Sequence, residues 1–76
     1  MTFQTIIHSS IYKKFKCYDE WFFGDTVFYF DKYLRERFPF ILSADYISVD
    51  NDMHGHRLFI FENESYYTWF ILTQLD

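Results

Sequence analysis

The stretch His56–Phe61, HRLFIF, decides the fold of this 76-residue chain, because it predicts a strand with two apolar faces. Side chains alternate across a strand, so Leu58 and Ile60 share one face and Phe59 and Phe61 share the other. Two apolar faces are typical of a central strand, or of a strand whose outer face meets a partner. The sequence therefore predicts a sheet with His56–Phe61 at its centre or at an interface.

A helix is expected directly after this strand. Asn63 can cap it, and Glu64 lies in its first turn, where a negative charge is favourable. Spacings of three and four residues predict an inner stripe made of Tyr67, Phe70, Ile71 and Gln74 or Leu75. The residues expected nearer the edge of this helix are Tyr66, Trp69 and Thr73.

The first part of the chain is less regular. Residues 2–7 alternate and predict a strand. Residues 11–18 are ambiguous, because their apolar side chains fit both a helical spacing and an alternating one. We favour a second strand here, hairpinned to the first, and the helical alternative stays open.

The middle of the chain predicts a helix followed by a strand and a turn. Gly24 and Asp25 open the helix, with Asp25 as its N-cap, and Pro39 ends it at Phe38. Its inner stripe is Val27, Phe30, Leu34 and Phe38. Residues 44–50 predict a strand with Asp45 and Ile47 on one face and Tyr46 on the other, and residues 51–55 form the turn.

This order predicts one α+β domain over residues 1–76. We expect an antiparallel sheet of three or four strands with two helices on one face. The arrangement is similar to a ferredoxin-like βαββαβ unit that lacks its final strand. The missing strand would leave an open edge, and open edges are either protected or used for pairing.

Aromatic residues are in surplus, since 20 of the 76 residues are Phe, Tyr or Trp. A domain near this size buries only about 60% of the surface that its unfolded chain exposes. We therefore expect the core not to absorb every ring, and some rings to form a surface patch that another molecule covers.

The net charge of −4 is unevenly distributed. Residues 1–38 carry a net charge of +1, whereas residues 39–76 carry −5, with Arg57 as their only Lys or Arg. A general nucleic-acid binder would instead show an excess of positive charge. The acidic half favours a partner with a basic surface.

No enzymatic or cofactor motif is present in the sequence. Two glycines, Gly24 and Gly55, provide no phosphate-binding loop, and no carboxylate pair can be assigned as acid and base. We therefore expect neither catalysis nor a cofactor. The single cysteine, Cys17, is expected to be a packed side chain, and a chain with one thiol suits a reducing cytosol. No signal peptide and no membrane-spanning apolar run are visible.

The segment from Asp50 to Gly55 resembles the start of a calcium-binding EF-hand loop, with Asp50 and Asp52 at the first two ligand positions. The resemblance fails at the twelfth position, where Phe61 replaces the required glutamate. The side chains of Asp50, Asp52, His54 and His56 could also converge on a transition metal. We interpret the segment as a polar hairpin tip and expect no metal.

The segment from Leu58 to Leu75 resembles the end of many small phage-encoded accessory proteins. The shared features are an apolar strand, a Phe-Glu-Asn-Glu cap at residues 61–64 and a short helix with Phe70 and Leu72. The resemblance implies an accessory protein that inhibits a host enzyme or antagonises host defence.

The first functional hypothesis is a non-enzymatic protein-binding module. Its expected partner-binding rings are Tyr46, Phe59, Phe61, Tyr66 and Trp69, and its expected acidic rim is Asp45, Asp50, Asp52, Glu62 and Glu64. The second hypothesis is an assembly protein whose own copies cover the aromatic patch. The third is a single-stranded nucleic-acid binder that stacks bases on Tyr46, Phe59 and Phe61. Against the third, those rings could belong to the core, with Leu58 and Ile60 facing outward.

Overall fold

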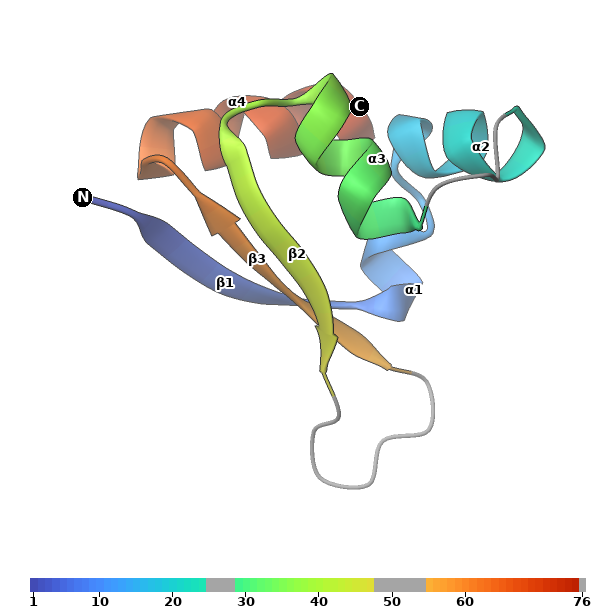
Figure 1. The fold of residues 1–76 in the computed structure, drawn as a ribbon, viewed down its shortest axis with the longest axis horizontal. Helices are drawn as coiled ribbons and strands as arrows, with labels where there is room; N and C mark the ends of the chain where they lie inside the picture. Colours follow the sequence, from blue (N-terminus) through green and yellow to red (C-terminus); the bar gives the residue numbers. More distant parts are fainter. Residues whose placement is uncertain (25–28, 48–54, 76) are drawn as a thin grey trace.

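The computed structural model describes residues 1–24, 29–47 and 55–75. These residues form an α+β fold with four helices and an antiparallel sheet of three strands (Figure 1). In chain order the elements are β1 (Phe3–His8), α1 (Ser9–Tyr12), α2 (Lys16–Phe23), α3 (Phe30–Arg37), β2 (Ile41–Ile47), β3 (His56–Phe61) and α4 (Glu64–Leu75). Helix α2 packs against α3 and α4.

The central strand of the sheet is β3, as its two apolar faces predicted. The strand order is β1-β3-β2, and both outer strands run antiparallel to β3. Residues directly opposite each other share a face, so the register separates two sets of side chains. Phe59 lies opposite Thr5 and Ala44, whereas Leu58 lies opposite Ile6 and Asp45.

The helices cover the face of the sheet that carries Phe59 and Phe61. Helices α1, α3 and α4 and the residue before α2 each place a ring on this face. Tyr12 of α1 and Phe30 of α3 lie 5.5 and 5.4 Å from the Arg57 guanidinium, on the same face as Phe59. Phe15, the residue that caps α2, lies 6.1 Å from Phe59, and Phe70 of α4 lies 5.7 Å from Phe61.

The core is built mainly from aromatic rings. Phe70 is completely buried, and its ring centre lies 5.3 Å from Phe15 and 5.1 Å from Phe38. Both contacts are edge-to-face, the arrangement that the ring quadrupoles favour. Leu34, Ile41 and Ala44 fill the remaining space and are also completely buried or nearly so.

The expectation of a second strand over residues 11–18 is wrong, because the chain forms α1 and α2 there. The imidazole of His8 accepts a hydrogen bond from the Ser10 N–H at 3.0 Å, which starts α1. A strand would put Lys13 on the same face as Phe15. The two short helices instead bury Phe15 and leave Lys13, Lys14 and Lys16 exposed to solvent. The expected total of two helices is therefore also wrong for the described residues.

Helix α3 is shorter than the apolar stripe in its sequence predicted. Tyr29 has an extended backbone, with φ −62° and ψ 154°, so α3 begins at Phe30 rather than at Asp25. Asp31 supplies the negative charge in the first turn and pairs with Arg35 at 3.5 Å. The expected cap Asp25 and the stripe residue Val27 lie outside the described residues. Phe30 and Leu34 are buried, as expected, and the helix ends before Phe38.

The C-terminal half agrees closely with its prediction. The strand at His56–Phe61 and the helix that begins at Glu64 are confirmed, and Asn63 Oδ1 accepts from the Tyr66 N–H at 3.1 Å. Strand β2 begins earlier than expected, at Ile41, and its predicted end, residues 48–50, lies outside the described residues. A helix that spans a membrane needs about 20 apolar residues. None of the helices in the described part of the chain has the length and apolarity to do so.

Candidate protein-binding groove

The exposed rings support the expectation that the core is too small for all of them. Among the described residues, six aromatic side chains are buried and six are exposed. The buried rings are Tyr12, Phe15, Phe30, Phe59, Phe61 and Phe70. The exposed rings are Phe22, Phe23, Tyr29, Tyr46, Tyr66 and Trp69.

Two of the exposed rings line an open groove beside α4. Tyr66 stacks on Phe40, with ring centres 4.7 Å apart and planes within 8° of parallel. Trp69 stands edge-on to Phe40 at 5.7 Å. Together with Ser65, these side chains enclose a hollow of about 330 Å³. Its volume is at the lower end of the range of small-ligand sites, about 300–1,000 Å³, and suits one large apolar side chain.

Local structure fixes the position of each groove residue. The Asn63 cap starts α4, so Tyr66 and Trp69, three residues apart, lie on the same side of the helix. The other wall is held by the Glu62 N–H, which donates to the Phe40 carbonyl at 2.9 Å and extends the pairing of β2 with β3. The groove is therefore built on α4 and on the turn before β2, which this hydrogen bond joins to the end of β3.

The start of α4, on one side of the groove, is acidic. Glu62 and Glu64 are both exposed and flank Asn63 at the start of α4. Arg57 is the only Lys or Arg in residues 39–76, and its side chain lies against Tyr12 and Phe30 on the helix-covered face. Its Nη1 donates to the Ala44 carbonyl at 2.8 Å. Arg57 thus packs against the core, and every charged side chain in the segment after Phe61 is negative.

The structure separates the sequence-predicted binding residues into several groups. Tyr66 and Trp69 line the groove, and Glu62 and Glu64 are exposed in the chain segment that leads into it. Tyr46 is exposed but lies at the opposite end of β2, one residue before the strand ends at Ile47. Asp45 is exposed on the uncovered face of the sheet, opposite Leu58. Asp50 and Asp52 lie outside the described residues.

The prediction that Phe59 and Phe61 are partner-binding rings is corrected, because both side chains are completely buried. The helices cover the face of β3 that carries Phe59 and Phe61, and Leu58 and Ile60 lie on the other face. The three-ring platform expected for stacked bases is therefore wrong, since only Tyr46 of its members reaches the surface. Sequence reasoning also missed Phe40, whose role depends on a contact with residues more than 20 positions away.

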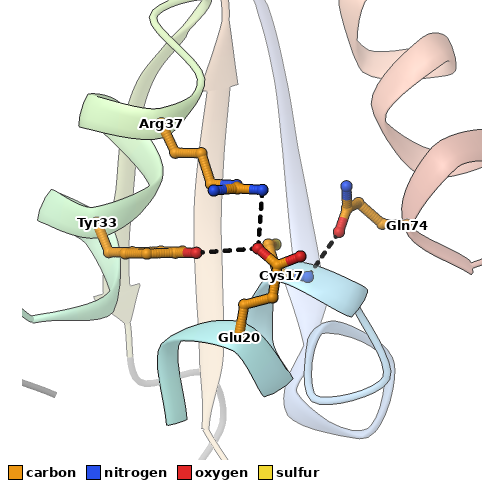
Figure 2. Close-up of polar contacts among 5 residues, drawn as sticks. All are labelled: Cys17, Glu20, Tyr33, Arg37 and Gln74. Carbon is orange, nitrogen blue, oxygen red and sulfur yellow. Dashed lines mark hydrogen bonds and ion pairs between the residues drawn. The ribbon is translucent and has the colours of Figure 1, made fainter. Parts of the chain in front are cut away.

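A polar cluster joins three helices (Figure 2). Glu20 of α2 accepts a hydrogen bond from the Tyr33 hydroxyl at 3.2 Å and pairs with Arg37 at 2.9 Å, both from α3. The backbone N–H of Cys17 donates to Oε1 of Gln74, which is buried on α4, at 2.8 Å. These contacts tie α2 to α3 and α4.

The thiol in this cluster is not activated. Cys17 is almost fully buried, and this burial raises its pKa to about 12. A nucleophilic cysteine needs a lowered pKa and access to solvent. Burial likewise raises the pKa of Tyr33. The cluster is thus a structural tie between helices, and Cys17 is packed as expected.

The expected polar hairpin tip falls largely outside the described residues. Of its candidate metal ligands only His56 is described, and its ring lies 4.6 Å from that of His8, in edge-to-face contact. Within the described ranges, no group of three or more His, Cys, Asp or Glu side chains is placed to hold a metal ion.

Comparison with known proteins finds no relative of this chain. No protein-family model matches the sequence, and no curated protein or solved structure matches the chain.

Proposed function

We propose that this chain is a small protein-binding module that takes an apolar side chain of its partner into the groove of Phe40, Tyr66 and Trp69. The observation that carries the proposal is the groove itself, in which Tyr66 and Trp69 remain 40% and 52% exposed around an open hollow. Packing of the core does not require Tyr66 and Trp69 to stay exposed beside an open hollow. Trp and Tyr are also the residues that most often dominate binding energy at interfaces.

The charge near the groove supports a basic partner. Glu62 and Glu64 are exposed at its end, and residues 58–75 contain no Lys or Arg. A partner segment with an apolar side chain next to Lys or Arg would match both features. Its cations could also contact the faces of the groove rings. Such binding weakens at high salt, because exposed charges are screened beyond about 10 Å at 0.1 M ionic strength.

We also propose that the partner is a host protein that the chain inhibits, acting in a reducing cytosol. This part rests on the resemblance of residues 58–75 to small phage accessory proteins and on the single thiol of Cys17. The proposed role is binding without catalysis. Coverage of the rings by other copies of the chain stays the alternative proposal, and it predicts that Trp69→Ala changes the oligomeric mass.

A peptide selection tests the groove without knowledge of the natural partner. A random peptide library is selected on the immobilised chain. The selected peptides are then titrated into the Trp21→Phe variant, in which Trp69 is the only tryptophan. We expect enrichment of peptides with an apolar residue beside Lys or Arg, and a change of Trp69 fluorescence on binding. Trp69→Ala, measured by titration calorimetry because it lacks the reporter tryptophan, should weaken binding at least about tenfold, as for an interface hot spot.

Phe23→Ala is the matched control, because Phe23 is an 81% exposed ring on α2 and does not line the groove. It should leave peptide affinity within about twofold, since it removes no groove contact. Peptides that bind wild type and Trp69→Ala equally well, or that lose affinity only with Phe23→Ala, would refute the groove as the binding site.

We further infer that the fold is a ferredoxin-like unit without its last strand. The strand order β1-β3-β2 supports this inference, because β3 lies between two strands that a helical crossover connects. In such a unit the absent strand would lie beside β1.

A further inference from the structure

The outer edge of β1 offers a regular row of backbone hydrogen-bonding groups. The Ser9 N–H donates to the Gly55 carbonyl at 3.2 Å, which marks a hydrogen-bonded pair at the end of the β1–β3 ladder. Hydrogen-bonded and non-hydrogen-bonded pairs alternate along an antiparallel ladder. Every second residue of β1 therefore turns its N–H and C=O away from β3. These residues are Gln4 and Ile6, whereas His8 at the end of the strand is the N-cap of α1.

The two edges of the sheet differ in how they are protected. Strand β2 follows Pro39, carries the charge of Asp45 and has a register irregularity at Leu42. Prolines, charges and bulges are devices that keep an edge from pairing with another chain. Strand β1 has none of them: its sequence FQTIIH contains no Pro, Gly, Asp, Glu, Lys or Arg, and its register is continuous. Within the described residues, no strand lies on this edge.

Helix α4 presents apolar side chains above the same edge. The Tyr67 ring lies 4.7 Å from that of Phe3 in β1. Residues four apart lie on one side of a helix, so Ile71 and Leu75 continue the side that Tyr67 begins. Ile71 is partly buried and Leu75 is 43% exposed. A strand added beside β1 would place its inner side chains against this side of α4.

We propose that this edge pairs with β1 of a second copy of the chain, antiparallel and across a two-fold axis at Ile6. In this register Ile6 lies opposite Ile6 of the second copy, and Gln4 lies opposite His8 of the second copy. Apolar side chains then meet each other, and a polar amide meets an imidazole. A shift of the axis to Thr5 would set Gln4 against Ile6 of the second copy, which is a poorer match.

A second copy fits this edge better than a charged foreign segment does. The chain carries a net charge of −4, yet β1 has no Asp, Glu, Lys or Arg, so two copies meet here without like charges opposite each other. The inner residues Thr5 and Ile7 of the second copy would lie near the apolar side of α4 on the first. The proposal does not depend on the groove, which lies on the other side of α4.

Disulfide trapping tests the register directly. Paired Cα atoms of a hydrogen-bonded antiparallel pair lie about 5.5 Å apart, within the range for a disulfide of about 4.4–6.8 Å. Under mild oxidation, Ile6→Cys should give a covalent dimer in native buffer and lose it in denaturant. Leu42→Cys is the matched control, since Leu42 is 45% exposed on the opposite edge strand and Ile6 is 53% exposed. The buried Cys17 thiol does not compete.

Sedimentation of the full chain tests the dimer itself. Wild type should show twice the chain mass of 9.5 kDa, and Ile6→Lys should show the single mass, because two lysines would face each other at the axis. Mixing Ile6→Lys with Ile6→Glu should restore the doubled mass, whereas Trp69→Ala and Leu42→Lys should leave it unchanged. A monomeric wild type overturns the proposal. So does equal trapping of both cysteine variants, or a dimer that Trp69→Ala dissociates while Ile6→Lys does not.

Discussion

Replacing Phe70 and Leu72 by alanine separates the two faces of α4. Phe70 has no exposed surface and packs against rings from β3, from the segment before α2 and from the end of α3. Leu72, two positions away, is 66% exposed. If folding needs only the inner face of α4, Phe70→Ala should strongly lower the free energy of unfolding and Leu72→Ala should hardly change it.

The expected magnitudes follow from burial. Truncation of a buried Phe to Ala costs about 3–5 kcal/mol, from lost transfer energy and from the cavity that remains. A chain of this length has a free energy of unfolding of roughly 4–11 kcal/mol, so Phe70→Ala removes a large part of it. Full burial of a Leu side chain contributes about 1.5–3 kcal/mol. Leu72 buries about one third of its surface, so Leu72→Ala should cost less than about 1 kcal/mol.

Urea unfolding followed by far-UV circular dichroism measures both values. Because Phe70→Ala could leave too little folded protein, Phe70→Leu is measured beside it and should cost about 1–2 kcal/mol, since it leaves a smaller cavity. The Leu72→Ala midpoint should lie close to wild type with an unchanged slope. Equal losses for Leu72→Ala and Phe70→Leu would show that the outer face of α4 stabilises the fold, and the reasoning would then fail.

Two further substitutions test the buried thiol and the tight approach at Gly55. Because burial raises the pKa of Cys17 from 9.0 to about 12, the folded chain keeps a proton that the unfolded chain loses. Its contribution to stability is complete below pH 9 and should be lost between pH 9 and 12 at on the order of 1 kcal/mol per pH unit. The unfolding free energy of Cys17→Ala should fall less steeply over that range, and parallel curves would contradict the shift. Gly55 has φ +82°, and a Cβ there would lie 2.5 Å from Cε2 of the Tyr46 ring, so Gly55→Ala should cost about 1–3 kcal/mol. Part of that loss should disappear in a Tyr46→Ala background, and an undiminished loss there would assign all of it to the backbone.

The C-terminal half could be predicted because its local signals agree. Alternation over His56–Phe61, the Asn63 cap and the helical spacing after it all point to the same elements, and the structure contains them. The inner position left open at the end of α4 needed the structure. Gln74 is buried there because its side chain accepts from the Cys17 N–H, while Leu75 stays exposed.

Helices α1 and α2 could not be predicted because the local signals of the chain conflict there. Residues 11–18 fit both spacings, and the choice depends on the distant sheet face that Phe15 must cover. The same limit applied to the two faces of β3, since both are apolar in sequence. Only the packing of Tyr12, Phe15, Phe30 and Phe70 determines that Phe59 and Phe61 are the covered pair. The groove depends on Phe40, which no local pattern connects with Trp69.

Helix α4 links the groove to the β1 edge. A helix that is apolar on all sides is normally buried, yet α4 exposes Tyr66, Trp69, Leu72 and Leu75. A partner side chain in the groove would cover Tyr66 and Trp69, and a second copy beside β1 would cover the side with Leu75. The two occupants would therefore lie on opposite sides of one helix without competing. If so, Ile6→Lys should leave peptide affinity unchanged, because the groove is complete within a single copy of the chain.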